Sequence, residues 1–459
     1  ALDRKIDTLR LAECESLVER GKQYLREENP FQALGRFRDA LALEPEHAWA
    51  TNGVGEAYFH LRRLKESREF VERAIELDPT CKDALFNEAY LDLQELDFTG
   101  CLEGLDRVLA VPPDPGRLGT REALMKKLQE EGATAGTPQE FWERYADSVL
   151  VQAGDLRPVI KGIVDGPGWK QEFVRVTDHY RVMTDISQEY ADLMAERLEL
   201  IHAEYERQFS YQKTGERKTR GKKLVHPVLV FEHRKDYADW FTRVLRNPQL
   251  AAQTGGVYVS MVKHLVFFKG KTFEDTQLVA WHEAFHQYLD HYIARAPHWF
   301  NEGQAEYFGA SVLPEGRKRV EVGQTNPWRM NVLAALVRQG RLPAAEELIQ
   351  RDAATFMGMV PKQDPRYAGK VLNSPVENYT ASWALVHFLI EGQRGRHEKL
   401  LLRYFKALSD GATHAEAFDA AFAKVRWDQM NAAFAAHCEW LLQRAQAETA
   451  GTDVPPPPR

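Results

Sequence analysis

The sequence predicts a helix-rich α+β protein, with an all-α repeat module at the N-terminus followed by a domain that has a small mixed sheet. Two observations lead to this prediction. The first third of the chain repeats itself at a fixed interval, and residues 173–268 alternate segments rich in Val, Thr and Tyr with segments of helical periodicity. With 459 residues, the chain is also too long for one typical domain.

The repeat is visible in three segments that end alike: "LALEPEH", "IELDPTC" and "LAVPPDP". Their prolines, Pro45, Pro79 and Pro113, are 34 residues apart, which is the period of the tetratricopeptide repeat. A glycine and a tyrosine recur in the first two units, as Gly21 and Gly55 and as Tyr24 and Tyr58. The third unit has Ala89 in place of the glycine and resembles a capping repeat. We expect a tetratricopeptide domain over residues 1–115 that either binds a protein partner on its concave surface or docks on the rest of the chain.

Helix-breaking segments divide the remainder of the chain. Residues 116–170 form a helical linker region, with one helix expected over 138–154 and a break at "DGPGW" (165–169). A second domain follows over 171–450, and the proline-rich residues 451–459 are expected to be a disordered tail.

The second domain begins with alternating strands and helices. The expected strands have β-branched and aromatic residues between turn signals, and the expected helices have apolar residues at helical spacing. The expected strands lie within 173–186 and at 226–233, 255–260 and 264–268, and the expected helices at 187–209 and 235–245. One of the last two strands is expected at the sheet edge, where an extended substrate could pair with it. The basic run "KTGERKTRGKK" (213–223) is expected to be a solvated loop.

The residues most typical of a catalytic or metal-binding site lie in one segment, "WHEAFHQYLDHYIARAPHWFNEGQAEYF", which runs from Trp281 to Phe308. The preceding "TFED" is a helix-capping pattern, and Leu278, Trp281, Phe285 and Leu289 form an apolar stripe, so a helix of roughly 20 residues is expected.

Two histidines on this helix, His282 and His286, are four residues apart and therefore about 40° apart on one face. Two imidazole nitrogens at this spacing can reach a single zinc ion. Glu283 projects to the side of that ion, where a base can take a proton from water.

The third ligand follows a turn in the chain. His291 lies on the opposite side of a continuous helix from His282, so it cannot complete the site. Pro297 turns the chain, and "HWFNEGQAEYF" starts a second helix that can present Glu302 to the same ion. Glu306, one turn later, is expected to accept the second N–H of a ligand histidine.

This arrangement resembles the gluzincin metallopeptidases, and within them the peptidase MA-like group, whose members often carry tetratricopeptide repeats. The similarity rests on His-Glu-x-x-His followed by "WFNEGQAEY" and covers about residues 173–395. It implies a zincin-like domain with a metal-binding helix. It also implies a zinc ion as cofactor, Glu283 as general base, and as ligands His282, His286 and Glu302. In this group a tyrosine that opens a later helix stabilises the oxyanion, and the matching stretch "ENYTASWALVHFLIEG" makes Tyr379 the candidate.

The resemblance implies zinc-dependent hydrolysis of peptide bonds. The segment "GGVYVSM" lacks the glutamate that zinc aminopeptidases use to bind the substrate amine, so an endopeptidase is favoured. The repeats would recruit a peptide or protein substrate, or a protein partner. The alternative is a non-catalytic tetratricopeptide scaffold with an inactive or structural zincin domain.

Composition bounds the remaining possibilities. Hydrophobic residues make up 44% and aromatic residues 11% of the chain, which is enough apolar material for packed cores. The net charge of -7 argues against nucleic-acid binding. No run of about 18 apolar residues predicts a membrane span. The first residues, Ala-Leu-Asp, leave the compartment open and favour an extracytoplasmic protein without its signal peptide over a cytoplasmic one.

Overall fold

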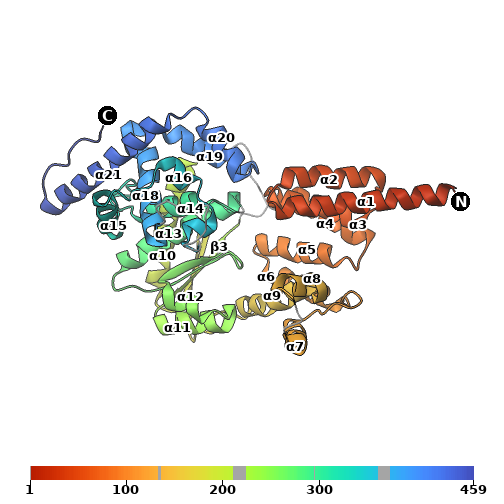
Figure 1. Ribbon diagram of the computed structural model, residues 1–459. Coiled ribbons are helices and arrows are strands. Elements are labelled where there is room, and N and C mark those ends of the chain that lie inside the picture. The colour runs from red at the N-terminus through yellow and green to blue at the C-terminus, as the bar shows by residue number, and fades with distance from the viewer. Residues whose placement is uncertain (1, 133–135, 210–223, 294, 360–372, 459) are drawn as a thin grey trace.

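The computed structural model describes residues 2–132, 136–209, 224–293, 295–359 and 373–458. It confirms the predicted fold class, because helical repeats at the N-terminus are followed by a helix-rich domain with a small mixed sheet (Figure 1). The basic run at 213–223 lies outside the described residues. Within them, no helix is long and apolar enough to cross a membrane.

Three helix pairs form the repeat module at the right of Figure 1. In the third pair the two helices approach closely at Ala89, where a Cβ added to Gly104 would lie 2.8 Å from the Ala89 Cβ. The glycine expected on the first helix of this unit is therefore replaced by one on the second, and close packing is kept. The pairs are α1 Leu2–Arg26 with α2 Pro30–Leu43, α3 Ala48–His60 with α4 Leu64–Leu77, and α5 Lys82–Gln94 with α6 Phe98–Ala110.

Three further helices connect the repeats to the second domain: α7 Arg121–Glu131, α8 Pro138–Tyr145 and α9 Ser148–Val164. The prediction of one helix over 138–154 was wrong. The chain breaks because Ala146 pairs with Leu118 in a short parallel bridge and Asp147 caps α9 through the Leu150 backbone N–H. The buried Asp147 carboxylate also accepts a hydrogen bond of 2.5 Å from Lys82 of the third repeat. This contact holds the start of α9 against that repeat.

Within the described residues, the sheet has five strands in the order β1-β2-β3-β5-β4. The two central pairings, β2 with β3 and β3 with β5, are parallel, and the two outer pairings are antiparallel. Of the two candidate edge strands, only β4 is at an edge, because β5 lies between β3 and β4. The bounds are β1 Phe173–Val176, β2 Tyr180–Thr184, β3 His226–Phe231, β4 Gly256–Val259 and β5 His264–Phe268.

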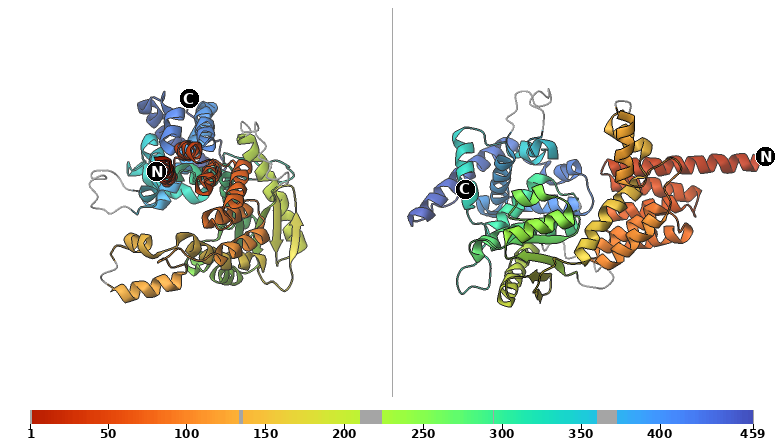
Figure 2. Two further views of the ribbon diagram at one scale, coloured as in Figure 1. Left: turned by 90° about the vertical axis from the view of Figure 1, so that its right-hand side faces the viewer. Right: turned by 90° about the horizontal axis from the view of Figure 1, so that it is seen from below.

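Helices cover both faces of this sheet. Alternate strand residues such as Val228 and Val230 face a core shared with helices α10, α13, α14 and α18. Their neighbours Leu229 and Phe231 face a second core that includes α9, α11 and the third repeat, so the repeats and the sheet share one hydrophobic cluster. Figure 2 shows the repeats against one side of the second domain. The helices are α10 Gln188–Gln208, α11 Arg234–Trp240, the π-helix η3 Phe241–Leu245, α12 Pro248–Gln253, α13 Phe273–Tyr292, α14 His298–Gly309, α15 Pro327–Arg338, α16 Ala345–Ile349, α17 Ala353–Phe356, α18 Pro375–Glu391, the 3-10 helix η5 Gly392–Gly395, α19 Glu398–Ser409, α20 His414–Phe422 and α21 Trp427–Ala450.

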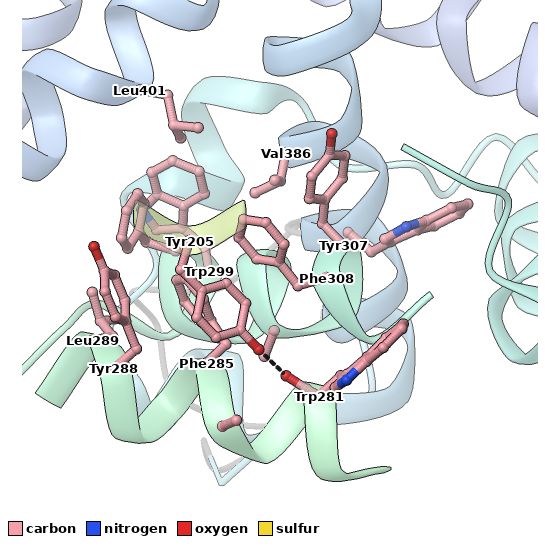
Figure 3. Close-up of a cluster of buried hydrophobic side chains, with 14 of the residues drawn as sticks. Tyr205, Trp281, Phe285, Tyr288, Leu289, Trp299, Tyr307, Phe308, Val386 and Leu401 are labelled. Carbon is pink, nitrogen blue, oxygen red and sulfur yellow. Dashed lines mark hydrogen bonds between the residues drawn. The ribbon is translucent and has the colours of Figure 1, made fainter. Parts of the chain in front are cut away.

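The predicted apolar stripe anchors α13. Trp281, Phe285 and Leu289 are buried, and Figure 3 shows them packed with aromatic side chains of α10 and α14. The Tyr205 hydroxyl donates a hydrogen bond of 2.6 Å to the Trp281 carbonyl, drawn as the dashed line. Leu278 is only half-buried. Because one face of α13 is fixed in this core, the face that carries the two histidines is held toward a cavity.

Candidate metal centre

Local sequence signals position the two helices of the site. The predicted cap of α13 is present as a reciprocal pair: the Asp275 N–H donates to Thr272 Oγ1, and the Thr272 N–H donates to the Asp275 carboxylate, both at 3.1 Å. Pro297 is the N-cap residue of α14, where its fixed φ turns the chain before a new helix. Helices α13 and α14 then pack against each other. The turn therefore brings the start of α14 beside the middle of α13.

The three predicted ligand side chains come together at this contact. The Nε2 atoms of His282 and His286 are 3.1 Å apart. The Glu302 Oε2 atom lies 3.8 Å from His282 Nε2 and 3.7 Å from His286 Nε2. Among the described residues this is the only group of three or more His, Cys, Asp or Glu side chains whose ligand atoms all lie within 4.8 Å of one another.

Neighbouring side chains orient these groups. The Asn301 Oδ1 atom lies 2.8 Å from His286 Nδ1. An amide oxygen accepts from Nδ1–H, which fixes the tautomer that leaves the Nε2 lone pair free to bind a metal. Glu306 was expected to accept a hydrogen bond from a ligand histidine. In the structure its Oε1 lies 3.8 Å from His282 Nδ1, which is too far for a hydrogen bond.

The Glu306 carboxylate instead accepts hydrogen bonds from residues of the later chain. Asn326 donates to it at 2.7 Å and Arg329 forms an ion pair with it. Burial works to raise the pKa of Glu306, but the electrostatic interaction with the His282 imidazole, the charge of Arg329 and the hydrogen bonds from Arg329 and Asn326 outweigh it, so the pKa lies below the usual value. Glu306 is therefore a charged group that the surrounding residues hold in place beside His282.

Glu283 faces the same cavity and is fixed by the edge strand. Its Oε2 accepts a hydrogen bond of 2.7 Å from the backbone N–H of Tyr258 on β4. The cavity has a volume of about 550 Å³ and is lined by the three predicted ligand side chains, Glu283, Arg329 and Tyr379. A base held at the cavity wall by a backbone donor keeps one carboxylate oxygen for a second contact.

Tyr379 lies on α18, in the first turns after the cap at Ser374. Its hydroxyl contacts the Met357 sulfur at 3.7 Å, and Arg329 lies over its ring. Burial and the negative charge of Glu302 raise the pKa of Tyr379 to about 12, so the phenol keeps its proton at neutral pH and is a hydrogen-bond donor.

The electrostatic surroundings favour a cation at the histidines. Burial works to lower the pKa of His286, but the charges of Glu302 and Glu283 and the hydrogen bond with Asn301 outweigh it, so the pKa lies above the usual value. Three carboxylates, Glu283, Glu302 and Glu306, act on this imidazole. The same negative field would stabilise a bound metal ion.

Sequence reasoning missed two kinds of residue. Asn301 stands inside the motif, directly before Glu302, and its role follows once α14 is known to return beside α13. Asn326 and Arg329 carry no local signal, because they reach Glu306 from the start of the next helix, α15, 20 and 23 residues later in the chain.

Two family models match separate parts of the chain. Residues 18–80 match the family described as tetratricopeptide repeat. The N-terminal module is made of tetratricopeptide repeats. Residues 278–411 match a family described as "Protein of unknown function (DUF1570)", and this segment contains the three predicted ligand side chains, Glu283 and Tyr379.

Two other comparisons complete the picture. A search of curated proteins gives no match. Among solved structures, a mutant O-GlcNAc transferase of Thermobaculum terrenum is similar at 11% identity and a TM-score of 0.23, over 60% of this chain and 44% of that chain. The similarity thus spans less than half of that protein.

Proposed function

We propose that this protein is a zinc-dependent peptidase of the gluzincin type that cleaves peptide bonds within a chain, and that its repeats recruit the substrate or a partner. The observation that supports this most is the convergence of His282, His286 and Glu302 on one wall of a cavity that also holds Glu283. Tetratricopeptide repeats are protein-interaction modules, which agrees with a polypeptide ligand.

The donor set fits zinc. Two imidazole nitrogens and one carboxylate oxygen are ligands that zinc accepts, and three protein ligands are typical of catalytic sites. Bonds of 2.0–2.1 Å in a tetrahedral arrangement place ligand atoms roughly 3.3 Å apart. The separations of 3.1, 3.7 and 3.8 Å are close to that value, so small side-chain movements suffice.

The chain's own residues have defined roles in this proposal. A zinc ion held there supplies Lewis acidity to a water molecule and to a substrate carbonyl group. The Tyr258 N–H orients Glu283, whose free carboxylate oxygen accepts the water proton and then passes it to the leaving amine. The Tyr379 hydroxyl, which keeps its proton, donates to the carbonyl oxygen as negative charge develops on it. The outer edge of β4 offers backbone groups to an extended peptide.

The alternative is a scaffold whose repeats carry the function and whose second domain is inactive. An intact base distinguishes the two, because a metal-binding structural domain has no need of Glu283. Replacement of Glu283 by Gln should abolish hydrolysis of labelled casein while the zinc content stays the same. The matched control is Glu274→Gln on the same helix, where the side chain is exposed.

The experiment has a clear opposite outcome. Equal casein hydrolysis by the native protein and Glu283→Gln, or none by either in the presence of bound zinc, would favour the scaffold. Retained hydrolysis by Glu274→Gln together with its loss in Glu283→Gln assigns the reaction to this base.

A further inference from the structure

The turns of the repeats meet the metal-site domain at one end of α13. Glu28, Arg62 and Leu96 are 34 residues apart, and all three have positive φ values of 58°, 54° and 60°. They are therefore the same turn position in successive repeats. In the first repeat Glu28 forms an exposed ion pair with Arg295. In the second, Arg62 reaches Asp290 of α13.

Asp290 lies one helical turn after His286 and is contacted by three donors from separate elements. Arg62 Nη2 donates to Asp290 Oδ1 at 2.6 Å. The Tyr258 hydroxyl and Lys263 Nζ donate to Asp290 Oδ2, at 2.6 and 2.5 Å. Burial works to raise the pKa of Asp290, but the charges of Arg62 and Lys263 outweigh it and lower the pKa. The carboxylate is therefore charged and held between two cations.

The Arg62 side chain is fixed from both sides. Only 6% of it is exposed, and its other terminal nitrogen, Nη1, donates to Gln94 of the third repeat at 2.9 Å. A planar guanidinium that bridges two acceptors transmits position better than a single flexible contact. Arg62 thus joins two repeats to α13.

The turn between β4 and β5 is bound to the same helix. Lys263 has a φ of 56° in this turn, and the Gln287 side-chain amide donates to its carbonyl at 3.0 Å. Tyr258 makes two contacts with α13: its hydroxyl bonds Asp290, and its backbone N–H bonds the Glu283 carboxylate at 2.7 Å. A shift of Asp290 or of the hairpin would therefore move the donor that orients Glu283.

We propose that the repeat module is a structural part of the active site, and that Arg62 positions the base Glu283 through Asp290 and Tyr258. This inference rests on the proposed function for its catalytic consequence. Its structural part, the link between Arg62 and the Tyr258 N–H, stands independently of any activity.

The charges make Arg62 a suitable residue to change. Without Arg62, Asp290 still pairs with Lys263, so no buried charge is left without a partner. Arg62→Met keeps most of the side-chain volume and removes only the charge and the hydrogen bonds of the guanidinium group. The adjacent Arg63 is the N-cap residue of α4, and its side chain is 48% exposed and pairs with Glu66 of that helix. It provides the matched control as Arg63→Met.

The test measures amide hydrogen exchange at Tyr258 in the full-length chain. In the native protein this amide should exchange slowly, although β4 is an edge strand, because it is bonded to Glu283. We expect faster exchange in Arg62→Met and the native rate in Arg63→Met. Equal rates in the two variants would overturn the proposal.

Activity on labelled casein provides the second readout. Zinc content should stay the same in Arg62→Met, because the ligands do not contact Arg62. The value of kcat should fall about 10-fold or more with little change in KM, as expected when a base is misplaced. Tyr258→Phe removes a single hydroxyl, and it should also speed exchange of the amide at position 258 and lower kcat. This variant provides the test if Arg62→Met does not fold. A native exchange rate and native kcat in Tyr258→Phe would overturn the proposal.

Failure of the proposed function gives a different result. If no variant, native protein included, cleaves casein but Arg62→Met still accelerates exchange at Tyr258, the positional link holds and the peptidase assignment fails. If casein is cleaved and Arg62→Met changes neither kcat nor exchange, the peptidase assignment holds and the link fails.

Discussion

Gly303, which follows Glu302 on α14, lies where this helix crosses α18. A Cβ added at Gly303 would be 2.7 Å from the Ser382 carbonyl oxygen and 2.8 Å from Val386 Cγ2. The first contact is about 0.7 Å shorter than the 3.4 Å at which ordinary contacts begin, and it is with backbone. Gly303→Ala must therefore separate α14 from α18, and Glu302 moves with α14.

The magnitude follows from comparison with a matched glycine. Gly35 is the sixth residue of α2, as Gly303 is of α14, and a Cβ there would meet nothing within 4 Å. Alanine gains about 0.8–1 kcal/mol over glycine in either helix interior from helix propensity. Forcing an extra methyl group into a packed site costs about 1–3 kcal/mol. Gly303→Ala should therefore be about 1–3 kcal/mol less stable than Gly35→Ala.

Native-state hydrogen exchange measures this difference, because it reports the opening free energy of each helix separately. We expect a lower opening free energy for α14 in Gly303→Ala, a higher one for α2 in Gly35→Ala, and weaker zinc binding only in Gly303→Ala. Equal stabilisation by both substitutions would refute the reasoning about the crossing of α14 and α18.

Three further predictions concern the site and its surroundings. Asn301→Ala should weaken zinc binding about 10–100-fold, measured by chelator competition, because the His286 ring loses its orienting acceptor; unchanged affinity would contradict this role. Burial, with charges of neighbouring groups, lowers the pKa of His202 and of His226 to about 3, whereas the unfolded chain binds these protons near pH 6.5. The free energy of unfolding should therefore be level above about pH 6.5. It should fall by about 1.4 kcal/mol per pH unit for each histidine as pH drops toward 3, because the unfolded state binds more protons there. Urea titrations that show no loss of unfolding free energy between pH 6.5 and 5 would contradict this. Added zinc should raise the melting temperature of the native protein and leave that of Glu302→Ala unchanged; an equal rise in both would place the bound metal elsewhere.

Local patterns in the sequence predicted the elements that form the site. The capping pair at Thr272 and the spacing of His282 and His286 depend only on helix geometry, and the turn at Pro297 depends only on its fixed backbone, so α13 and the return of α14 followed from residues close in the chain. The structure brings Glu302 to the histidines as the pattern predicted. That these residues bind zinc, and that Tyr379 is an oxyanion donor, stay predictions.

Contacts between segments far apart in the chain could not be predicted from these local patterns. Glu306 was expected to bond a ligand histidine, but Asn326 and Arg329 compete for its oxygens from a later helix. The link from Arg62 to Asp290 spans 228 positions, and no periodicity in the sequence reports it. The break at Asp147 likewise depends on Lys82 of the third repeat. Each of these outcomes is decided by tertiary contacts, which local propensity and spacing do not contain.

The zinc content per chain, measured on the native protein and on Glu302→Ala after purification in trace zinc, tests the central claim most directly. The account predicts about one zinc ion per native chain and none retained by a folded Glu302→Ala variant, because two imidazoles alone hold the ion weakly. No zinc in the native protein, or equal zinc in both, would contradict the three-ligand site and with it the proposed peptidase.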